Sequence, residues 1–177
     1  IYGRIMIGDI MKKIMIVGSP GSGKSTLSRE LAEILGYKVL HLDYIFHIDN
    51  VLNIGREKLK EKTRDFALAN KTFIIDGNYG GTMAYRMQFC DTIIFFDLPT
   101  DICVENVMKR QQLEKRPDMA PGFDVSIMDD NFLEYVKDFR ESKIQEIEDN
   151  ITDNKHLTVI RLTSYKDKEE FLKNLGG

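Results

Sequence analysis

Residues 18–25 read Gly-Ser-Pro-Gly-Ser-Gly-Lys-Ser and fit the pattern G-x-x-x-x-G-K-[ST]. In such a loop successive backbone N–H groups converge on phosphate oxygens, because glycine leaves that approach free of side chains. An apolar run precedes the loop and an amphipathic run follows it, which predicts a strand before the loop and a helix after it. The helix would point its positive end at the same anion. The motif therefore predicts a site for a nucleoside triphosphate.

The last residues of this motif have separate tasks in the predicted site. Lys24 is long enough to reach the β- and γ-phosphates of ATP, and the hydroxyl of Ser25 is a suitable ligand for Mg²⁺. ATP and Mg²⁺ are the expected cofactors. A glycine-rich turn that binds nothing is the competing interpretation, and the strand–loop–helix context disfavours it. The residues expected to hold the nucleotide are Ser19, Pro20, Gly21, Ser22, Gly23, Lys24, Ser25 and Thr26.

Short β-branched runs alternate with helical patterns along the rest of the chain, as in proteins with a parallel sheet covered by helices. Several runs are apolar at successive positions, which is typical of strands that are buried on both faces. The predicted strands are 12–17, 38–42, 72–76, 92–97 and 157–162, and the predicted helices are 24–35, 56–69, 101–113, 127–150 and 166–175. These elements predict an α/β fold with three layers, a sheet between two layers of helices.

The chain shows no internal repeat and no linker, so we expect residues 11–177 to form one domain. The polar, proline-containing segment at about 111–126 is expected to act as a small lid. Met11 looks like a natural start, and we interpret residues 1–10 as an N-terminal extension.

Four segments in this order resemble the topology modulation proteins, a family similar to the adenylate kinases and shikimate kinases. They are HLD at 41–43, IIDGNYGGT at 74–82, IIFFDLP at 93–99 and KRPDMAPGF at 115–123. The resemblance covers about residues 11–174. It implies a P-loop NTPase fold like that of the nucleotide kinases, with a five-stranded parallel sheet in the order 2-3-1-4-5. Adenylate kinases carry Asp-Gly-Phe-Pro-Arg where this chain has Asp76-Gly-Asn-Tyr-Gly80, so the arginine that grips AMP is missing and AMP is not expected as the acceptor.

Two aspartates end predicted strands, Asp43 in KVLHLD and Asp76 in TFIID. The carboxyl ends of parallel strands line the crevice in which α/β proteins bind ligands. With the implied strand order, Asp76 lies about 5 Å from the phosphate loop laterally and Asp43 about 10 Å. Asp76 therefore suits Mg²⁺, and Asp43 suits an acceptor hydroxyl that it would orient or deprotonate, unless it merely caps the following segment. Asp97 is expected to serve the turn before Pro99.

Arginines are the natural groups to stabilise charge on a transferring phosphoryl group. Arg110 leads into the predicted lid and Arg116 lies within it, so both are expected over the phosphates when the lid closes. Arg86 is a candidate for an anionic group of the acceptor, and His47 for contact with the acceptor. His41 is expected to pack in the interior.

The overall composition narrows the choice of partners. The net charge is −3 and the isoelectric point about 5.7, which disfavours a broad nucleic-acid surface but leaves DNA association possible. No apolar run approaches the ~20 residues that cross a bilayer, so no membrane partner is expected. Cys90 and Cys103 have neither metal-ligand spacing nor the pattern of a disulfide framework, which favours a cytoplasmic protein.

The leading hypothesis is a kinase that transfers the γ-phosphoryl group of ATP to a small-molecule or nucleotide-like acceptor. Its predicted catalytic residues are Lys24, Asp43, Asp76, Arg110 and Arg116, and its predicted metal ligands are Ser25 and Asp76. The alternative is an ATP-binding regulatory module that acts on DNA or a protein, as the name of the resembling family suggests. A GTPase is disfavoured because NKTF at 70–73 lacks the aspartate of the guanine-reading motif Asn-Lys-x-Asp. The acceptor and the oligomeric state stay open.

Overall fold

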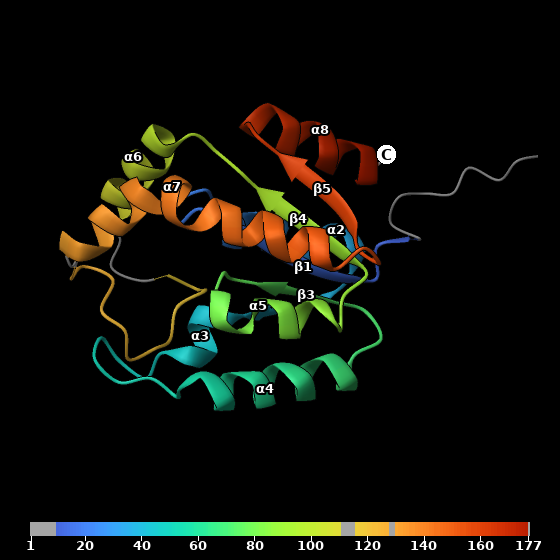
Figure 1. The fold of residues 1–177 in the computed structure, drawn as a ribbon, viewed down its shortest axis with the longest axis horizontal. Helices are drawn as coiled ribbons and strands as arrows, with labels where there is room; N and C mark the ends of the chain where they lie inside the picture. Colours follow the sequence, from blue (N-terminus) through green and yellow to red (C-terminus); the bar gives the residue numbers. More distant parts are fainter. Residues whose placement is uncertain (1–9, 111–115, 128–129, 177) are drawn as a thin grey trace, which may run out of the picture.

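The computed structural model describes residues 10–110, 116–127 and 130–176. Five strands form one parallel sheet in the order β2-β3-β1-β4-β5, which confirms the predicted sheet and its order (Figure 1). The strands are β1 (Lys13–Gly18), β2 (Lys38–His41), β3 (Phe73–Asp76), β4 (Thr92–Phe96) and β5 (Thr158–Leu162). Because all five run in one direction, their carboxyl ends meet at the same edge of the sheet.

Helices fill the connections between the strands. Five of them match predicted helices: α2 (Lys24–Leu35), α4 (Arg56–Ala69), α6 (Thr100–Arg110), α7 (Asp130–Asp153) and α8 (Tyr165–Gly176). Two short helices, α3 (Leu42–Phe46) and α5 (Gly80–Met87), were not predicted. They are only five and eight residues long, and α5 begins with two glycines, so neither carries the repeated apolar period of a longer helix.

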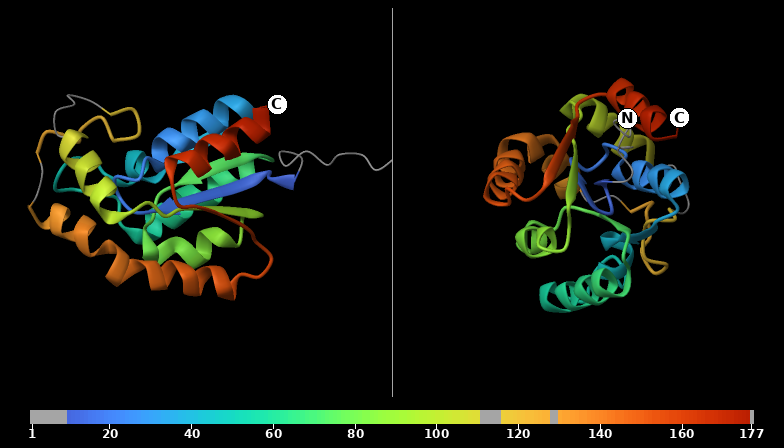
Figure 2. Two further views of the ribbon diagram at one scale, coloured as in Figure 1. Left: turned by 90° about the horizontal axis from the view of Figure 1, so that it is seen from above. Right: turned by 90° about the vertical axis from the view of Figure 1, so that its right-hand side faces the viewer.

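The helices cover both faces of the sheet, as the two views of Figure 2 show. Alternate residues of a strand point to opposite faces. On β1, Ile14 and Ile16 pack with residues of α2, α6 and α8, whereas Met15 and Val17 pack with residues of α4, α5 and α7. All four side chains are fully buried. The α/β interpretation with three layers is therefore confirmed.

Asp97 follows β4 and has a larger structural role than the turn that we expected. Its carboxylate lies 2.7 Å from the guanidinium of Arg140 on α7 and 2.6 Å from that of Arg161 on β5. Asp97 is buried. It therefore ties a helix and an edge strand to the end of β4, a role that depends on residues far away in the sequence.

Residues 116–127, the described part of the predicted lid, lie against the segment that follows α3. The side chain of Asn50 donates to the carbonyl of Asp124 over 3.0 Å and accepts from its amide over 2.7 Å. The ring of Phe123 packs on His47 with centroids 4.9 Å apart. The rest of the predicted lid, 111–115, and most of the predicted extension, 1–9, lie outside the described residues.

Candidate nucleotide and acceptor site

The phosphate loop joins β1 to α2 at the carboxyl edge of the sheet. Its glycines hold conformations that other residues rarely adopt, with φ of +83° at Gly21 and +91° at Gly23. At Gly21 a Cβ atom would also lie 2.3 Å from the carbonyl oxygen of Cys103 on α6. Both the backbone angle and the close approach of α6 thus require glycine there.

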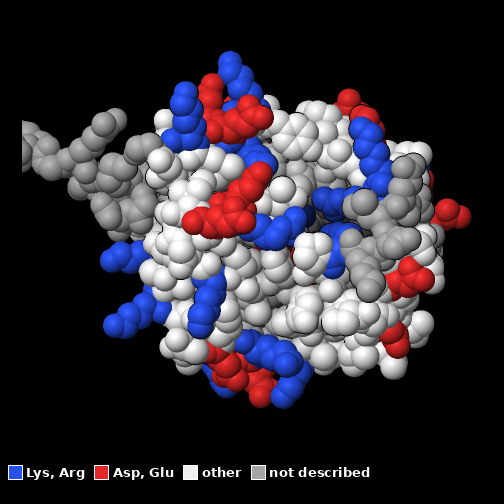
Figure 3. Space-filling view, turned by 180° about the vertical axis from the view of Figure 1, so that it is seen from behind, with Lys and Arg blue, Asp and Glu red and all other residues white. Residues whose placement is uncertain are grey.

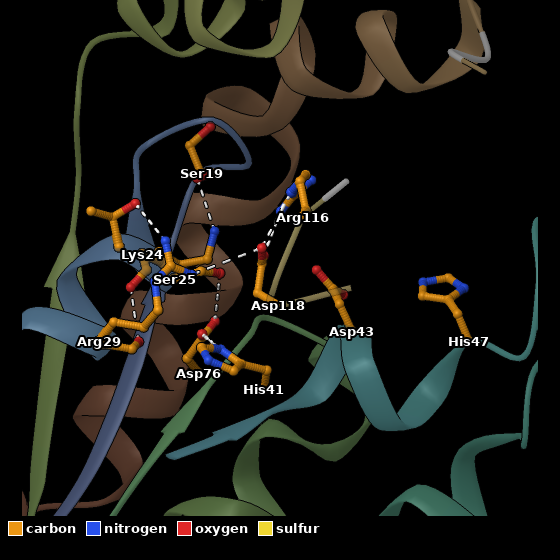
Figure 4. Close-up of polar contacts among 12 residues, drawn as sticks. Ser19, Lys24, Ser25, Arg29, His41, Asp43, His47, Asp76, Arg116 and Asp118 are labelled. Carbon is orange, nitrogen blue, oxygen red and sulfur yellow. Dashed lines mark hydrogen bonds and ion pairs between the residues drawn. The ribbon is translucent and has the colours of Figure 1, made fainter. Parts of the chain in front are cut away.

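Lys24 begins α2 and points back across the loop (Figure 4). Its Nζ donates a hydrogen bond to the carbonyl of Ser19 over 3.0 Å. Burial lowers the pKa of Lys24 to about 8, against the opposing effect of the carboxylates of Asp76 and Asp43. Burial disfavours the charged form of Lys24, and a phosphate chain beside the ammonium would favour it.

Asp76 connects the phosphate loop to the end of β2. The Ser25 hydroxyl lies 3.5 Å from Asp76 Oδ1, and His41 Nδ1 contacts Asp76 Oδ2 (Figure 4). The strand register explains the contacts, because Asp76 pairs with Ile16 on one side and with His41 on the other. The His41 side chain is only 15% exposed, in line with the predicted interior position, but it contacts a carboxylate at the polar edge of the sheet.

Asp43 lies on α3 and not at the end of a strand, because β2 stops at His41. The hydroxyl of Tyr79 donates to Asp43 Oδ1 over 2.6 Å and lies 3.3 Å from Nε2 of His47. Tyr79 has φ of +40°, and it is the one non-glycine residue with positive φ in the described part of the chain. Burial and the Asp43 carboxylate raise the pKa of Tyr79 far above its usual value, so its hydroxyl keeps its proton.

Arg86 holds the backbone of residues 77–79 in this conformation. Its guanidinium donates to the carbonyl of Gly77 over 3.0 Å, to that of Asn78, and to that of Tyr79 over 3.3 Å. Arg86 is fully buried, and burial lowers its pKa to about 10. The prediction that it meets an anionic acceptor group is therefore wrong, since its donors are used inside the protein.

The same segment is fastened to the phosphate loop through Asn78. The side-chain oxygen of Asn78 accepts from the amide of Gly18 over 3.0 Å, and its nitrogen donates to the carbonyl of Gly18 over 2.7 Å. Gly18 is the first residue of the phosphate motif. The loop after β3 thus makes two contacts with the site. Asn78 contacts the phosphate loop, and Tyr79 contacts Asp43.

Asp118 is a site residue that the sequence analysis did not single out. It is buried and accepts from Arg116 over 2.5 and 3.3 Å (Figure 4). Burial opposes its ionisation, but the charge and hydrogen bonds of Arg116, together with a bond from Ser25, lower the pKa of Asp118 to about 2. The sequence did offer a signal for this pair, because Arg116 and Asp118 carry opposite charges only two residues apart. Asp118 links the lid to Ser25.

A cleft of about 680 Å³ runs from the phosphate loop to α7. It brings together nine of the predicted site residues: Pro20, Gly21, Gly23, Lys24, Ser25, Asp43, Asp76, Arg110 and Arg116. Arg110 also borders a smaller hollow of about 370 Å³ with Thr26. Burial and the neighbouring Arg116 lower the pKa of Arg110. Ser22 is fully buried. Ser19 contributes its carbonyl, which accepts the hydrogen bond from Lys24.

Acidic and basic side chains are interspersed over the face seen in Figure 3. DNA association gains no support from this face, because a nucleic-acid surface gathers positive charge. In residues 10–110, 116–127 and 130–176, no helix combines the length and apolar character that crossing a bilayer requires.

Comparison with known proteins relates this arrangement to phosphotransferases. Residues 14–76, from β1 to the end of β3, match the model of the AAA domain family AAA_33. Shikimate kinases from Clostridium botulinum strains ATCC 19397 and Kyoto are each 26% identical over 167 residues, covering 89% of this chain and 91% of the relative.

Solved shikimate kinases resemble the chain in three dimensions. The enzyme from Bacteroides thetaiotaomicron has a TM-score of 0.56 and 17% identity, covering 93% of this chain and 96% of that one. The enzyme from Acinetobacter baumannii in complex with shikimate has a TM-score of 0.57 and 15% identity, covering 93% of this chain and 90% of that one. The chain has the fold of a shikimate kinase.

This fold agrees with the broader resemblance to adenylate and shikimate kinases. The narrower resemblance to topology modulation proteins finds no support among these relatives, and neither does the regulatory alternative. The relatives favour a phosphotransferase and leave its acceptor open.

Proposed function

We propose that this protein is an ATP-dependent kinase that transfers the γ-phosphoryl group to a hydroxyl of a small molecule. The observation that carries the proposal is that Lys24 and Asp43 face the same cleft. A cation for the donor phosphates and a carboxylate for the acceptor are the two groups that such a transfer needs. Residues 11–177 would form the catalytic domain, with 111–126 as its lid and 1–10 as an extension.

The donor half of the cleft gathers positive charge. Lys24 would contact the β- and γ-phosphates, while Arg110 and Arg116 would stabilise the charge that spreads over the transferring group. In the present structure Arg116 is paired with Asp118, and phosphate oxygens would compete for the same guanidinium donors. The backbone of residues 19–26 would hold the phosphate chain.

Magnesium fits the donors beside the loop, because the Ser25 hydroxyl and the Asp76 carboxylate are hard oxygen ligands 3.5 Å apart. Within the described residues, no three His, Cys, Asp or Glu side chains form a metal site of their own. Such a site suits an ion that keeps several waters and shares its shell with phosphates. When bound, magnesium supplies positive charge that offsets the charge on the phosphates.

Asp43 would take the proton of the acceptor hydroxyl. Tyr79 occupies Asp43 Oδ1, so we assign the acceptor hydroxyl to Oδ2. Tyr79 keeps its own proton and therefore acts as a donor that orients the carboxylate. This makes Asp43 the proposed base and Tyr79 a positioning residue.

The test is a screen for acceptor-stimulated ADP release with Mg–ATP and a panel of nucleosides, nucleotides and small polyols. We expect at least one compound to raise the rate over the acceptor-free rate, and Lys24→Ala and Asp43→Asn each to remove that increase. Lys24→Ala should also weaken Mg–ATP binding, whereas Asp43→Asn should leave it nearly unchanged. Tight Mg–ATP binding with no stimulated release by any compound would refute the kinase proposal and favour a regulatory ATP binder.

A further inference from the structure

The half of the cleft away from Lys24, here called the acceptor half, is lined by Asp43, His47, Tyr79, Phe123 and the 132–147 part of α7. Asp43 and His47 lie on the side of the site away from Lys24 in Figure 4. The phosphoryl transfer proposed above uses only Asp43 and Tyr79 of this half. The chemical character of the remaining side chains in this half indicates what kind of acceptor it would bind.

Aromatic rings form one wall of the acceptor half. Phe132 and Tyr135 are 41% and 38% exposed although both are large and apolar, and their ring centroids lie 6.4 Å apart. Tyr135 continues the wall to buried Phe139, edge to face at 5.7 Å. Exposed rings that line a pocket favour a planar apolar partner, because ring–ring contact adds to the gain from burial.

The lid closes the same half with another ring. Phe123 packs against His47, and Asn50 holds the neighbouring backbone of Asp124 with two hydrogen bonds. A flat molecule on the α7 rings would therefore meet an aromatic side chain of the lid as well. The lid contacts explain how such a molecule would be shielded from water.

The charges of the acceptor half disfavour an anion. Asp43 and Glu146 carry negative charge there, and Lys143 lies 3.4 Å from Glu146. Arg116, which also lines the cleft, is assigned above to the donor phosphates. A carboxylate or phosphate on the acceptor would thus meet the carboxylates of Asp43 and Glu146, while Lys143 beside them is already paired with Glu146. Placing an anion beside like charges costs binding energy, so the site selects against acids.

We propose that the acceptor is an uncharged alcohol carried on a planar aromatic ring. The ring would lie on the α7 wall and the hydroxyl on Asp43. Its oxygen attacks the γ-phosphorus, the bond from that phosphorus to the β–γ bridging oxygen breaks, ADP leaves with the electron pair, and Asp43 takes the hydroxyl proton. This inference rests on the proposed kinase function, and it separates the chain from its shikimate kinase relatives, since shikimate is a carboxylic acid.

Binding is measured first, by saturation-transfer NMR with the wild-type chain in excess Mg–ADP, so that the donor site is filled. The probes are adenosine, thymidine and benzyl alcohol, against shikimate, AMP, glycerol and myo-inositol. We expect the ring alcohols to bind about tenfold more tightly than the acids and the aliphatic polyols. The same compounds are then tested for stimulated ADP release with Mg–ATP.

Variants locate the binding site. Tyr135→Ala and Phe132→Ala should each weaken ring-alcohol binding about fivefold and leave Mg–ATP binding unchanged. Tyr85→Ala is the matched control, because Tyr85 packs on Phe89 and does not line the cleft. Glu146→Gln removes one carboxylate and the partner of Lys143, so it should strengthen shikimate binding.

The outcomes separate the two proposals. Preferred binding and phosphorylation of shikimate, AMP or a polyol would overturn the acceptor class and leave the kinase function standing. Ring alcohols that bind at Tyr135 without any ADP formation would support the ring site and count against the kinase function. Absence of ring-alcohol binding, or binding unaffected by Tyr135→Ala and Phe132→Ala, would overturn the inference.

Discussion

The hydroxyl of Tyr79 donates to Oδ1 of Asp43 over 2.6 Å, and the backbone that carries this tyrosine is in the left-handed region. A non-glycine residue in that region costs of order 1 kcal/mol or more and needs support from its surroundings. Arg86 supplies that support through the carbonyls of residues 77–79. The position of Asp43 thus depends on a short, strained loop and on one buried guanidinium.

Removing the Tyr79 hydroxyl should slow phosphoryl transfer more than it affects nucleotide binding. A hydrogen bond to a charged group contributes about 1.5–3 kcal/mol, so Tyr79→Phe should lower kcat at least tenfold. The KM for Mg–ATP should stay the same, because the ring still packs on Phe46. Steady-state kinetics with an acceptor from the screen test this, with Tyr85→Phe as control. Equal kcat for Tyr79→Phe and wild type would show that the hydroxyl has no part in positioning Asp43.

The affinity for Mg–ATP should fall at high pH. Without nucleotide the pKa of Lys24 is lowered to about 8, whereas phosphate oxygens beside Nζ favour its charged form. Above pH 8 binding must therefore take up a proton, and the affinity should decrease up to about tenfold per pH unit, while below pH 8 it should be nearly constant.

Calorimetry between pH 7 and 9.5, in two buffers of different ionisation enthalpy, measures this proton uptake. Lys24→Arg is the control, because a guanidinium keeps its charge over the whole range. A flat affinity profile for the wild-type chain would mean that Lys24 does not face the phosphates.

Two glycines with similar backbone angles should differ in their tolerance of alanine. Gly21 has φ of +83° and a Cβ there would lie 2.3 Å from the carbonyl oxygen of Cys103, whereas Gly36 has φ of +70° and no atom within 4 Å of its Cβ position. Gly36→Ala should cost about 1 kcal/mol of unfolding free energy, from backbone strain alone. Gly21→Ala should cost clearly more and should abolish Mg–ATP binding, because α6 must move away from the loop.

Urea denaturation and calorimetry of both variants provide the comparison. Gly36→Ala should bind Mg–ATP like the wild-type chain. If Gly21→Ala bound it equally well, the close approach of α6 would not matter for the phosphate loop.

Arg86 should contribute strongly to folding although it lies close to the site. Arg86→Gln leaves the buried carbonyl of Gly77 and the part-buried carbonyls of Asn78 and Tyr79 without their donor, and each such loss costs about 1–3 kcal/mol. The variant should lose roughly 3 kcal/mol of unfolding free energy, which urea denaturation followed by circular dichroism measures. Arg56→Gln, at the exposed start of α4, is the control and should change stability little. A loss below about 1 kcal/mol for Arg86→Gln would contradict the role assigned to Arg86.

Much of the fold could be predicted from local patterns. The strands and the longer helices follow from the periods of their apolar residues, and the start of α2 follows from the spacing of the phosphate motif. The strand order came from a family resemblance and was correct. The short helices α3 and α5 were missed, because one or two turns carry too few residues to show a period.

The sequence by itself determined that this chain has a phosphate loop on an α/β sheet, since glycine spacing and apolar periods act over a few neighbouring residues. Only the tertiary structure decided which charges meet. It placed Arg86 inside the protein, joined Asp97 to Arg140 and Arg161, brought Asp118 to Ser25, and set Tyr79 against Asp43. The physical reason is that these contacts join segments that are distant in sequence, and burial then determines whether a charge serves the fold or faces a ligand.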